Sequence, residues 1–372
     1  MIKPIIKVCL IIFFLKTSFC SSQTQDTYFI GHSLIGHAIP TMLDQMANAS
    51  GVNYTGSRQI INGAPLQFNW NNPTLGEVGN YEIDLATGNY NTLVITEAIP
   101  LKNHLEWSDT FNVSNNFYNY FYNYITNGQV YIYETWHCIN SGTPAGCAYD
   151  GEDHINWRQR LDEDLDDWES IVINLNNLHP NTEVLVVPGG QAVAALYDAV
   201  LNNEITGVNN ISYFFADDIH LNDIGSYYMA CVMYATLFRQ SPIGLIFNTE
   251  DPWGTAYNSP GEVLGTKLQE LAFETVCNYS RSGFDCSTLS VPNTNENSNF
   301  LVTQNNNEVN IEMFSDDIAK INLYDLQGRT IISKNVNNQK QCSFKINNFS
   351  KTMYILNVQT SKGIRMQKKI IL

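Results

Sequence analysis

The sequence predicts a three-layer α/β/α domain with a parallel sheet, followed by a small C-terminal all-β sandwich. Strand-like and helix-like stretches alternate between residues 24 and 290, which is typical of a parallel sheet with helices on both faces. Residues 291–299 have linker composition and no hydrophobic periodicity, and residues 300–372 hold only short β-like runs separated by turns. We therefore expect two domains joined by a short linker.

The elements of the first domain follow from short apolar runs and from helical periodicity. We expect strands at residues 27–30, 91–96, 129–134 and 183–187, and helices at residues 35–49, 157–178, 190–201 and 223–238. In the second domain, β-like runs occur at residues 309–313, 321–324, 330–332, 342–346 and 354–358. Their even spacing indicates a small sandwich.

Residues 1–22 have the pattern of a secretory signal peptide. Lys3 and Lys7 precede an apolar run at residues 8–15, which is too short to span a bilayer. Acylation of Cys20 is a less favoured alternative, because the bulky Phe19 precedes it. No later segment has the ~20 consecutive apolar residues of a transmembrane helix, so we expect a soluble, exported mature protein.

Cysteine and charge patterns agree with export. Cys138 with Cys147, and Cys277 with Cys286, enclose short polar loops and are expected to form local disulfides, whereas Cys231 in an apolar run is expected to be a buried thiol. Residues 21–290 carry seven Lys or Arg against thirty Asp or Glu. An acidic surface repels phosphate backbones, so no nucleic-acid partner is expected.

Two segments at the ends of the first domain carry the candidate chemistry. Ser33 follows the first strand and precedes the first helix, where a hydroxyl is exposed at the carboxyl edge of the sheet, although such a serine is commonly a helix cap. His220 lies just before the last helix and has the residue type of a base for a serine nucleophile. Asp217, three residues earlier, is spaced to hold the imidazole, with Asp218 as the alternative.

These segments together resemble the SGNH/GDSL hydrolase superfamily, whose first block reads G-D-S-L after a strand and whose last block reads D-x-x-H. Here the first block reads GHSL, so His32 replaces the usual acid. The resemblance covers residues 27 to about 240. It implies a flavodoxin-like fold, a Ser33–His220–Asp217 triad with an acyl-enzyme intermediate, and no cofactor.

The resemblance also implies an oxyanion hole made by the Ser33 N–H, a second-block glycine and a third-block asparagine. Gly63 is the second-block candidate, and its alternative role is a simple turn. The third block departs from the family, because Glu-Ala-Ile-Pro at residues 97–100 replaces G-x-N-D. Either Glu97 is protonated and donates, or it turns away while Asn103 or His104 supplies the donor.

A further cluster follows the strand at residues 129–134. Trp136 is a candidate for stacking on a sugar ring and His137 for binding polar groups of the substrate, with loop packing beside the Cys138–Cys147 bridge as the alternative. His154 has acidic neighbours but no second histidine at ligand spacing, so a solvated loop is favoured over a metal site.

The last eighty residues resemble the C-terminal sorting domain of the type IX secretion system, in the segments INLYDLQGR, MYILNVQTSKG and KKIIL. This resemblance implies the outer-membrane secretion machinery as a partner and a secreted or cell-surface location. A carbohydrate-binding module is the alternative, but an obvious aromatic platform is lacking.

The expected function is a secreted serine esterase that removes ester groups, chiefly O-acetyl, from extracellular polysaccharide. One alternative is a lipid, aryl-ester or polyester hydrolase that uses the same triad. The other is a non-catalytic glycan-binding surface protein, which the altered third block supports.

Overall fold

The computed structural model describes residues 26–286, and beyond them residues 300–305, 308–314, 316–325, 329–345, 353–362 and 365–371. The chain divides into two compact units, residues 1–285 and residues 286–372, and each is described by itself. The signal peptide expected at residues 1–22 and the linker expected at residues 291–299 lie outside the described residues.

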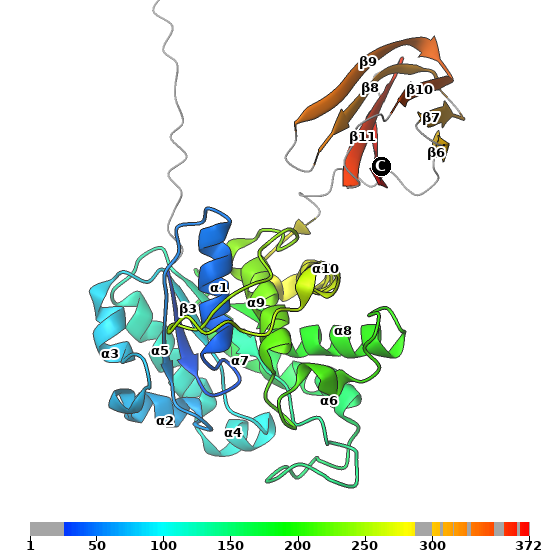
Figure 1. The fold of residues 1–372 in the computed structure, drawn as a ribbon. Coiled ribbons are helices and arrows are strands. Elements are labelled where there is room, and N and C mark those ends of the chain that lie inside the picture. The colour runs from blue at the N-terminus through cyan, green and yellow to red at the C-terminus, as the bar shows by residue number, and fades with distance from the viewer. Residues whose placement is uncertain are drawn as a thin grey trace, which may run out of the picture. The chain divides into compact units, whose positions relative to one another are not determined.

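The first unit is built on a five-stranded sheet with strand order β2-β1-β3-β4-β5, and every neighbouring pair is parallel (Figure 1). This is the flavodoxin-like order, so the predicted fold class is confirmed. The strands are β1 (Thr27–Gly31), β2 (Gly56–Ile60), β3 (Thr92–Ile95), β4 (Gln129–Glu134) and β5 (Leu185–Pro188).

Helices cover both faces of this sheet, because alternate side chains of each strand point to opposite faces and those of β1, β3, β4 and β5 are mostly apolar. One face packs against α5 and α7 in a core that includes Phe117 and Trp168. The other is covered by α1, α8, α9 and α10 (Figure 1). The helices are α1 (Ala38–Ala49), α2 (Leu66–Asn71), α3 (Tyr81–Asp84), α4 (Leu101–Trp107), α5 (Thr110–Tyr122), α6 (Trp157–Glu163), α7 (Leu165–Leu178), α8 (Gly189–Leu201), α9 (Asp223–Phe238) and α10 (Gly261–Asn278).

Several elements differ from the sequence prediction, and helices α5 and α10 were not among the expected helices. The single helix expected at residues 157–178 is broken at Asp164 into α6 and α7, and the Asp164 side chain is buried beside Arg160 and His137. Strand β2 was not expected, because its sequence Gly-Ser-Arg-Gln-Ile is mostly polar. It lies at the edge of the sheet, where side chains need not be apolar.

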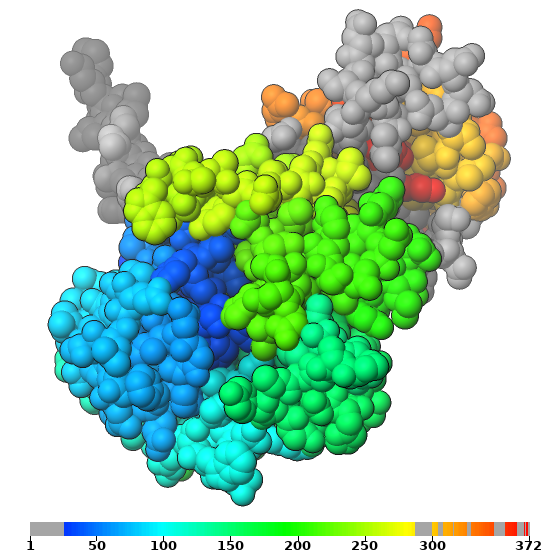
Figure 2. All heavy atoms as spheres, turned by 60° about the horizontal axis from the view of Figure 1, so that its bottom comes forward, coloured from blue at the N-terminus to red at the C-terminus, as the bar shows by residue number. Residues whose placement is uncertain are grey.

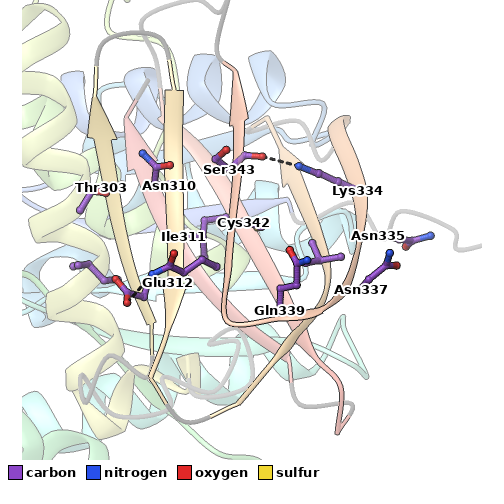
Figure 3. Close-up of a pocket in the computed structure, with 13 residues that line it drawn as sticks. Thr303, Asn310, Ile311, Glu312, Lys334, Asn335, Asn337, Gln339, Cys342 and Ser343 are labelled. Carbon is purple, nitrogen blue, oxygen red and sulfur yellow. Dashed lines mark hydrogen bonds between the residues drawn. The ribbon is translucent and has the colours of Figure 1, made fainter.

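The second unit is an antiparallel β-sandwich. Its sheets have orders β10-β7-β6 and β12-β11-β8-β9, and their inward residues form one core that includes Ile311, Leu323 and Leu356. A cavity of about 650 Å³, lined mainly by polar side chains such as Asn310, Lys334 and Ser343, lies between strands of this unit (Figure 3). The strands are β6 (Phe300–Asn305), β7 (Glu308–Met313), β8 (Ile318–Tyr324), β9 (Thr330–Gln339), β10 (Gln341–Lys345), β11 (Met353–Thr360) and β12 (Arg365–Ile371).

Cys138 and Cys147 form a disulfide, as expected, and Cys277 and Cys286 are also disulfide-bonded. Disulfides are typical of proteins that fold outside the reducing cytosol. Cys231 is a free, fully buried thiol, and burial raises its pKa. Among the described helices, we find none with the length and apolar character needed to cross a bilayer.

Candidate active site

Ser33 lies at the carboxyl end of β1, in the turn that leads to α1. The carbonyl of His32 accepts hydrogen bonds from the N–H groups of Ile35 and Gly36, so the chain turns sharply directly after the strand. Helix α1 begins only at Ala38, and its N-cap is His37. Ser33 is therefore not a helix cap, and its side chain is left for another role.

The structure joins Ser33 to the histidine expected as its base. His220 Nε2 lies 2.9 Å from Ser33 Oγ, and His220 Nδ1 lies 2.7 Å from Asp217 Oδ2. Although 187 positions separate serine and histidine, both lie at the carboxyl edge of the sheet. Asp217, rather than Asp218, is the carboxylate that contacts the ring.

Asp217 also organises the loop that carries His220. Its Oδ1 accepts hydrogen bonds from the N–H groups of Ile219 at 2.8 Å and of His220 at 2.7 Å. Burial acts to raise the pKa of Asp217, but these two N–H groups and the His220 ring outweigh it and lower the pKa. An ionised Asp217 accepts a hydrogen bond from the Nδ1–H of His220, so the neutral ring presents Nε2 as an acceptor to Ser33.

His32, directly before Ser33, is a buried structural link. Leu34 N–H points at its Nδ1 at 3.4 Å, so Nε2 carries the proton and donates to the Glu97 carbonyl at 2.9 Å. Burial lowers the pKa of His32 to about 4, and nearby His104 and His220 add to this when charged. A neutral imidazole thus ties the serine turn to the end of β3.

The loop with Gly63 lies against the serine turn. Ile61 N–H donates to the Gly31 carbonyl at 3.0 Å, and the buried Asn69 amide lies 3.3 Å from the same oxygen. Gly63 has a φ of 68°, a left-handed conformation that favours glycine. Within the described part of the chain, the N–H groups of Ser33 and Gly63 donate to no acceptor.

The Glu97 carboxyl group is held by donors from three neighbouring residues. The group is fully buried, and Oε1 accepts hydrogen bonds from Leu66 N–H at 2.9 Å and Ala98 N–H at 2.8 Å. Oε2 lies 2.8 Å from the Thr110 hydroxyl. Burial raises the pKa of Glu97 although these donors oppose the shift. Glu97 thus binds backbone N–H groups, as one of the two expected arrangements required of it.

The two alternative donors of the third block differ in their surroundings. The Asn103 amide donates to the Tyr149 carbonyl at 3.3 Å, and its expected role at the oxyanion site stays a prediction. His104 Nδ1 contacts Ser108 Oγ at 2.8 Å, and its charge influences His32. The role of His104 as an alternative donor stays a prediction as well.

Trp136 and His137 are not placed to contact substrate, and these two expectations are corrected. Trp136 is 0% exposed, so no ring face is open to a sugar, and its Nε1 donates to the Ile219 carbonyl at 2.8 Å. His137 is buried beside the Asp164 carboxylate. Arg160, also buried, pairs with Asp150 at 2.5 Å in the same cluster. Loop packing, the alternative expectation, is observed.

Figure 2 looks toward the carboxyl ends of the strands. The dark blue first part of the unit, which includes the turn after β1, lies in a recess. Light blue, cyan and green segments surround it, and these come from residues after β2, after β3 and beyond β4 (Figure 2). This face of the first unit is therefore hollowed where its dark blue first part is visible (Figure 2).

Comparisons with known proteins bear on each unit. Residues 289–372 match a family model described as a domain of unknown function, DUF8694. No curated protein matches the chain. The chain is similar to the structure of a DUF4886 family protein from Bacteroides uniformis, with 17% identity and a TM-score of 0.51, over 69% of this chain and 96% of that one.

Two further structures have lower TM-scores. One is described as a GDSL-like lipase from Parabacteroides merdae, with 15% identity and a TM-score of 0.39, over 57% of this chain and 94% of that one. The other is a family 3 carbohydrate esterase from Clostridium thermocellum, with 12% identity and a TM-score of 0.35, over the same shares. At these identities, it is the fold of the first unit that the comparisons establish.

Proposed function

We propose that the chain is a serine ester hydrolase in which Ser33, His220 and Asp217 form a catalytic triad. The observation that carries this proposal is the unbroken chain of contacts from Ser33 Oγ through the His220 ring to the Asp217 carboxylate, at 2.9 and 2.7 Å. Each group has the residue type and the geometry that a serine nucleophile, its base and the orienting acid require.

In the proposed reaction, His220 Nε2 takes the proton of Ser33 Oγ as this oxygen attacks the ester carbonyl carbon. Asp217 stabilises the imidazolium, and the N–H groups of Ser33 and Gly63 donate to the oxyanion. The alcohol leaves with the proton from His220, which yields the acyl-enzyme. Water then gives a proton to His220 and attacks the acyl carbon, and the acid leaves as Ser33 regains its proton.

The position of Glu97 supports an enzyme over a non-catalytic glycan-binding protein. An ionised carboxyl group in the oxyanion site would oppose the negative charge of the tetrahedral intermediate. Glu97 instead holds Leu66 and Ala98 through their N–H groups. These contacts support the proposal that the departure in the third block brings no charge conflict to the site.

We propose O-acetyl groups on an extracellular polysaccharide as the substrate, in preference to lipid, aryl or polyester substrates. The disulfides support a compartment outside the cytosol. Tyr149, which is 95% exposed, lies on the loop that Asn103 of α4 contacts, and it supplies an aromatic surface of the kind that binds sugars. Delivery by the outer-membrane secretion machinery, through residues 300–372, is part of the same proposal.

Hydrolysis of 4-nitrophenyl acetate tests the chemistry. Ser33→Ala and His220→Ala are each expected to lower kcat by about six orders of magnitude. Ser170→Ala is the matched control, because that hydroxyl bonds only within its own helix. Unchanged turnover in Ser33→Ala would refute the triad. Faster release of acetate from an acetylated polysaccharide than of long-chain acids from lipid esters is expected, and the reverse would overturn the substrate class.

A further inference from the structure

The loop that carries the proposed acid and base is open to solvent on its outer side. The side chains of His220 and Asp217 are 42% and 52% exposed. A hydrogen bond between two such exposed side chains competes with water, so its net contribution is too small to hold both side chains in one position by itself. The position of the His220 ring must therefore be set by contacts that the loop makes through its backbone.

Two of these backbone contacts come from the segment that follows β4. Trp136 Nε1 donates to the Ile219 carbonyl at 2.8 Å, and Ile139 N–H donates to the Asp218 carbonyl at 2.7 Å. These carbonyls belong to the two residues between Asp217 and His220 in the chain. Asp217 binds the N–H groups of the turn while the segment after β4 binds its carbonyls, so both sides of its backbone are held.

The Trp136 side chain is itself firmly placed. It is fully buried, and its ring makes edge contacts with Tyr133 of β4 and with Phe215, at 6.4 and 6.5 Å between ring centroids. Phe215 and Leu221 form a backbone bridge across the base of the loop with His220. The indole thus contacts this loop at two places, the Phe215 ring at its base and the Ile219 carbonyl next to His220.

The segment after β4 is also anchored from behind. The Trp157 indole donates to the His137 carbonyl at 2.7 Å, and the Cys138–Cys147 disulfide closes the next part of the chain. Buried Arg160 pairs with Asp150 in the loop that follows. Because the segment after β4 makes several buried contacts, it moves little. It can therefore hold the loop with His220, which is exposed on its outer side.

We propose that Trp136 is a positioning residue, which holds His220 in register with Ser33 through its hydrogen bond to Ile219. The inference rests on the proposed function and adds a residue to it. A misplacement of about 1 Å at a reacting group costs on the order of a hundredfold in rate, so one lost backbone contact is enough to be measured. Trp136 touches no reacting atom and acts only through the loop.

Two variants at this position separate the hydrogen bond from the packing. Trp136→Phe removes the indole N–H and one ring, whereas 3-benzothienylalanine at position 136 keeps both rings and loses only the N–H. Trp168→Phe is the matched control, because Trp168 is equally buried but packs in the core on the α5 and α7 face. Turnover of 4-nitrophenyl acetate is measured per active site, counted by stoichiometric labelling with a fluorophosphonate.

Both Trp136 variants are expected to lower kcat about tenfold with an unchanged KM, and Trp168→Phe to lower only the melting temperature. If the benzothienylalanine variant keeps the full kcat per labelled site, the hydrogen bond does not position His220 and the inference fails. This outcome differs from failure of the proposed function, in which Ser33→Ala would keep its turnover. Loss of labelled sites without a change in kcat would assign Trp136 to folding alone.

Discussion

Buried His32 makes the stability of the first unit sensitive to acid. Burial lowers its pKa from 6.5 to about 4, so the unfolded chain binds a proton more readily than the folded one. At pH values between about 4 and 6.5, the unfolded state holds more protons than the folded state. The free energy of unfolding therefore falls as the pH falls. The shift corresponds to about 3 kcal/mol at full extent, most of which is lost between about pH 7.5 and 4.5.

Urea unfolding at about pH 7.5 and at about pH 4.5 measures the free energy of unfolding of the wild type and of His32→Gln. Glutamine offers a donor and an acceptor but does not titrate, so the variant is expected to lose about 2 to 3 kcal/mol less on acidification than the wild type. All six tryptophans lie between residues 70 and 253, so their fluorescence reports unfolding of the first unit alone.

His154→Gln provides the matched control, because His154 lies on an exposed loop. It is expected to keep the acid sensitivity of the wild type. An equal loss of stability in the wild type and in His32→Gln would show that His32 titrates alike in the folded and unfolded chain. The account of His32 as a neutral buried link would then be wrong.

Three further predictions concern other parts of the chain. Asp217→Asn keeps an oxygen for the N–H groups of the loop but presents no carboxylate to the His220 ring, so kcat is expected to fall by about four orders of magnitude; a near-normal initial rate would contradict this. Glu97→Ala leaves two buried N–H groups unpaired and is expected to lower the free energy of unfolding in urea by about 2 to 4 kcal/mol. Glu97→Gln retains an acceptor and is expected to lower it by less than about 1 kcal/mol. Equal losses in the two variants would refute the assigned contacts. A chain ending near residue 290 is expected to keep full esterase activity and to accumulate in the periplasm, and its delivery to the cell surface would rule out the sorting role of residues 300–372.

The sequence by itself determined the features that depend on neighbouring residues. The position of Ser33 at the carboxyl edge of the sheet could be predicted, because a strand, a turn and a helix follow one another within a few residues. Asp217 and His220 are three positions apart, so one loop brings the carboxylate to the ring. The parallel sheet then places the ends of distant strands at one edge, which brings His220 to Ser33.

Only the tertiary structure decided what the buried polar groups contact. Glu97 finds Leu66, which lies 31 positions away, and Trp136 finds Ile219, which lies 83 positions away. From sequence, Glu97 had two possible arrangements and Trp136 was expected to meet sugar. A buried polar group must find a partner, but its residue type does not specify which one. That choice depends on the distances set when the strands and helices pack, and no local pattern in the sequence encodes them.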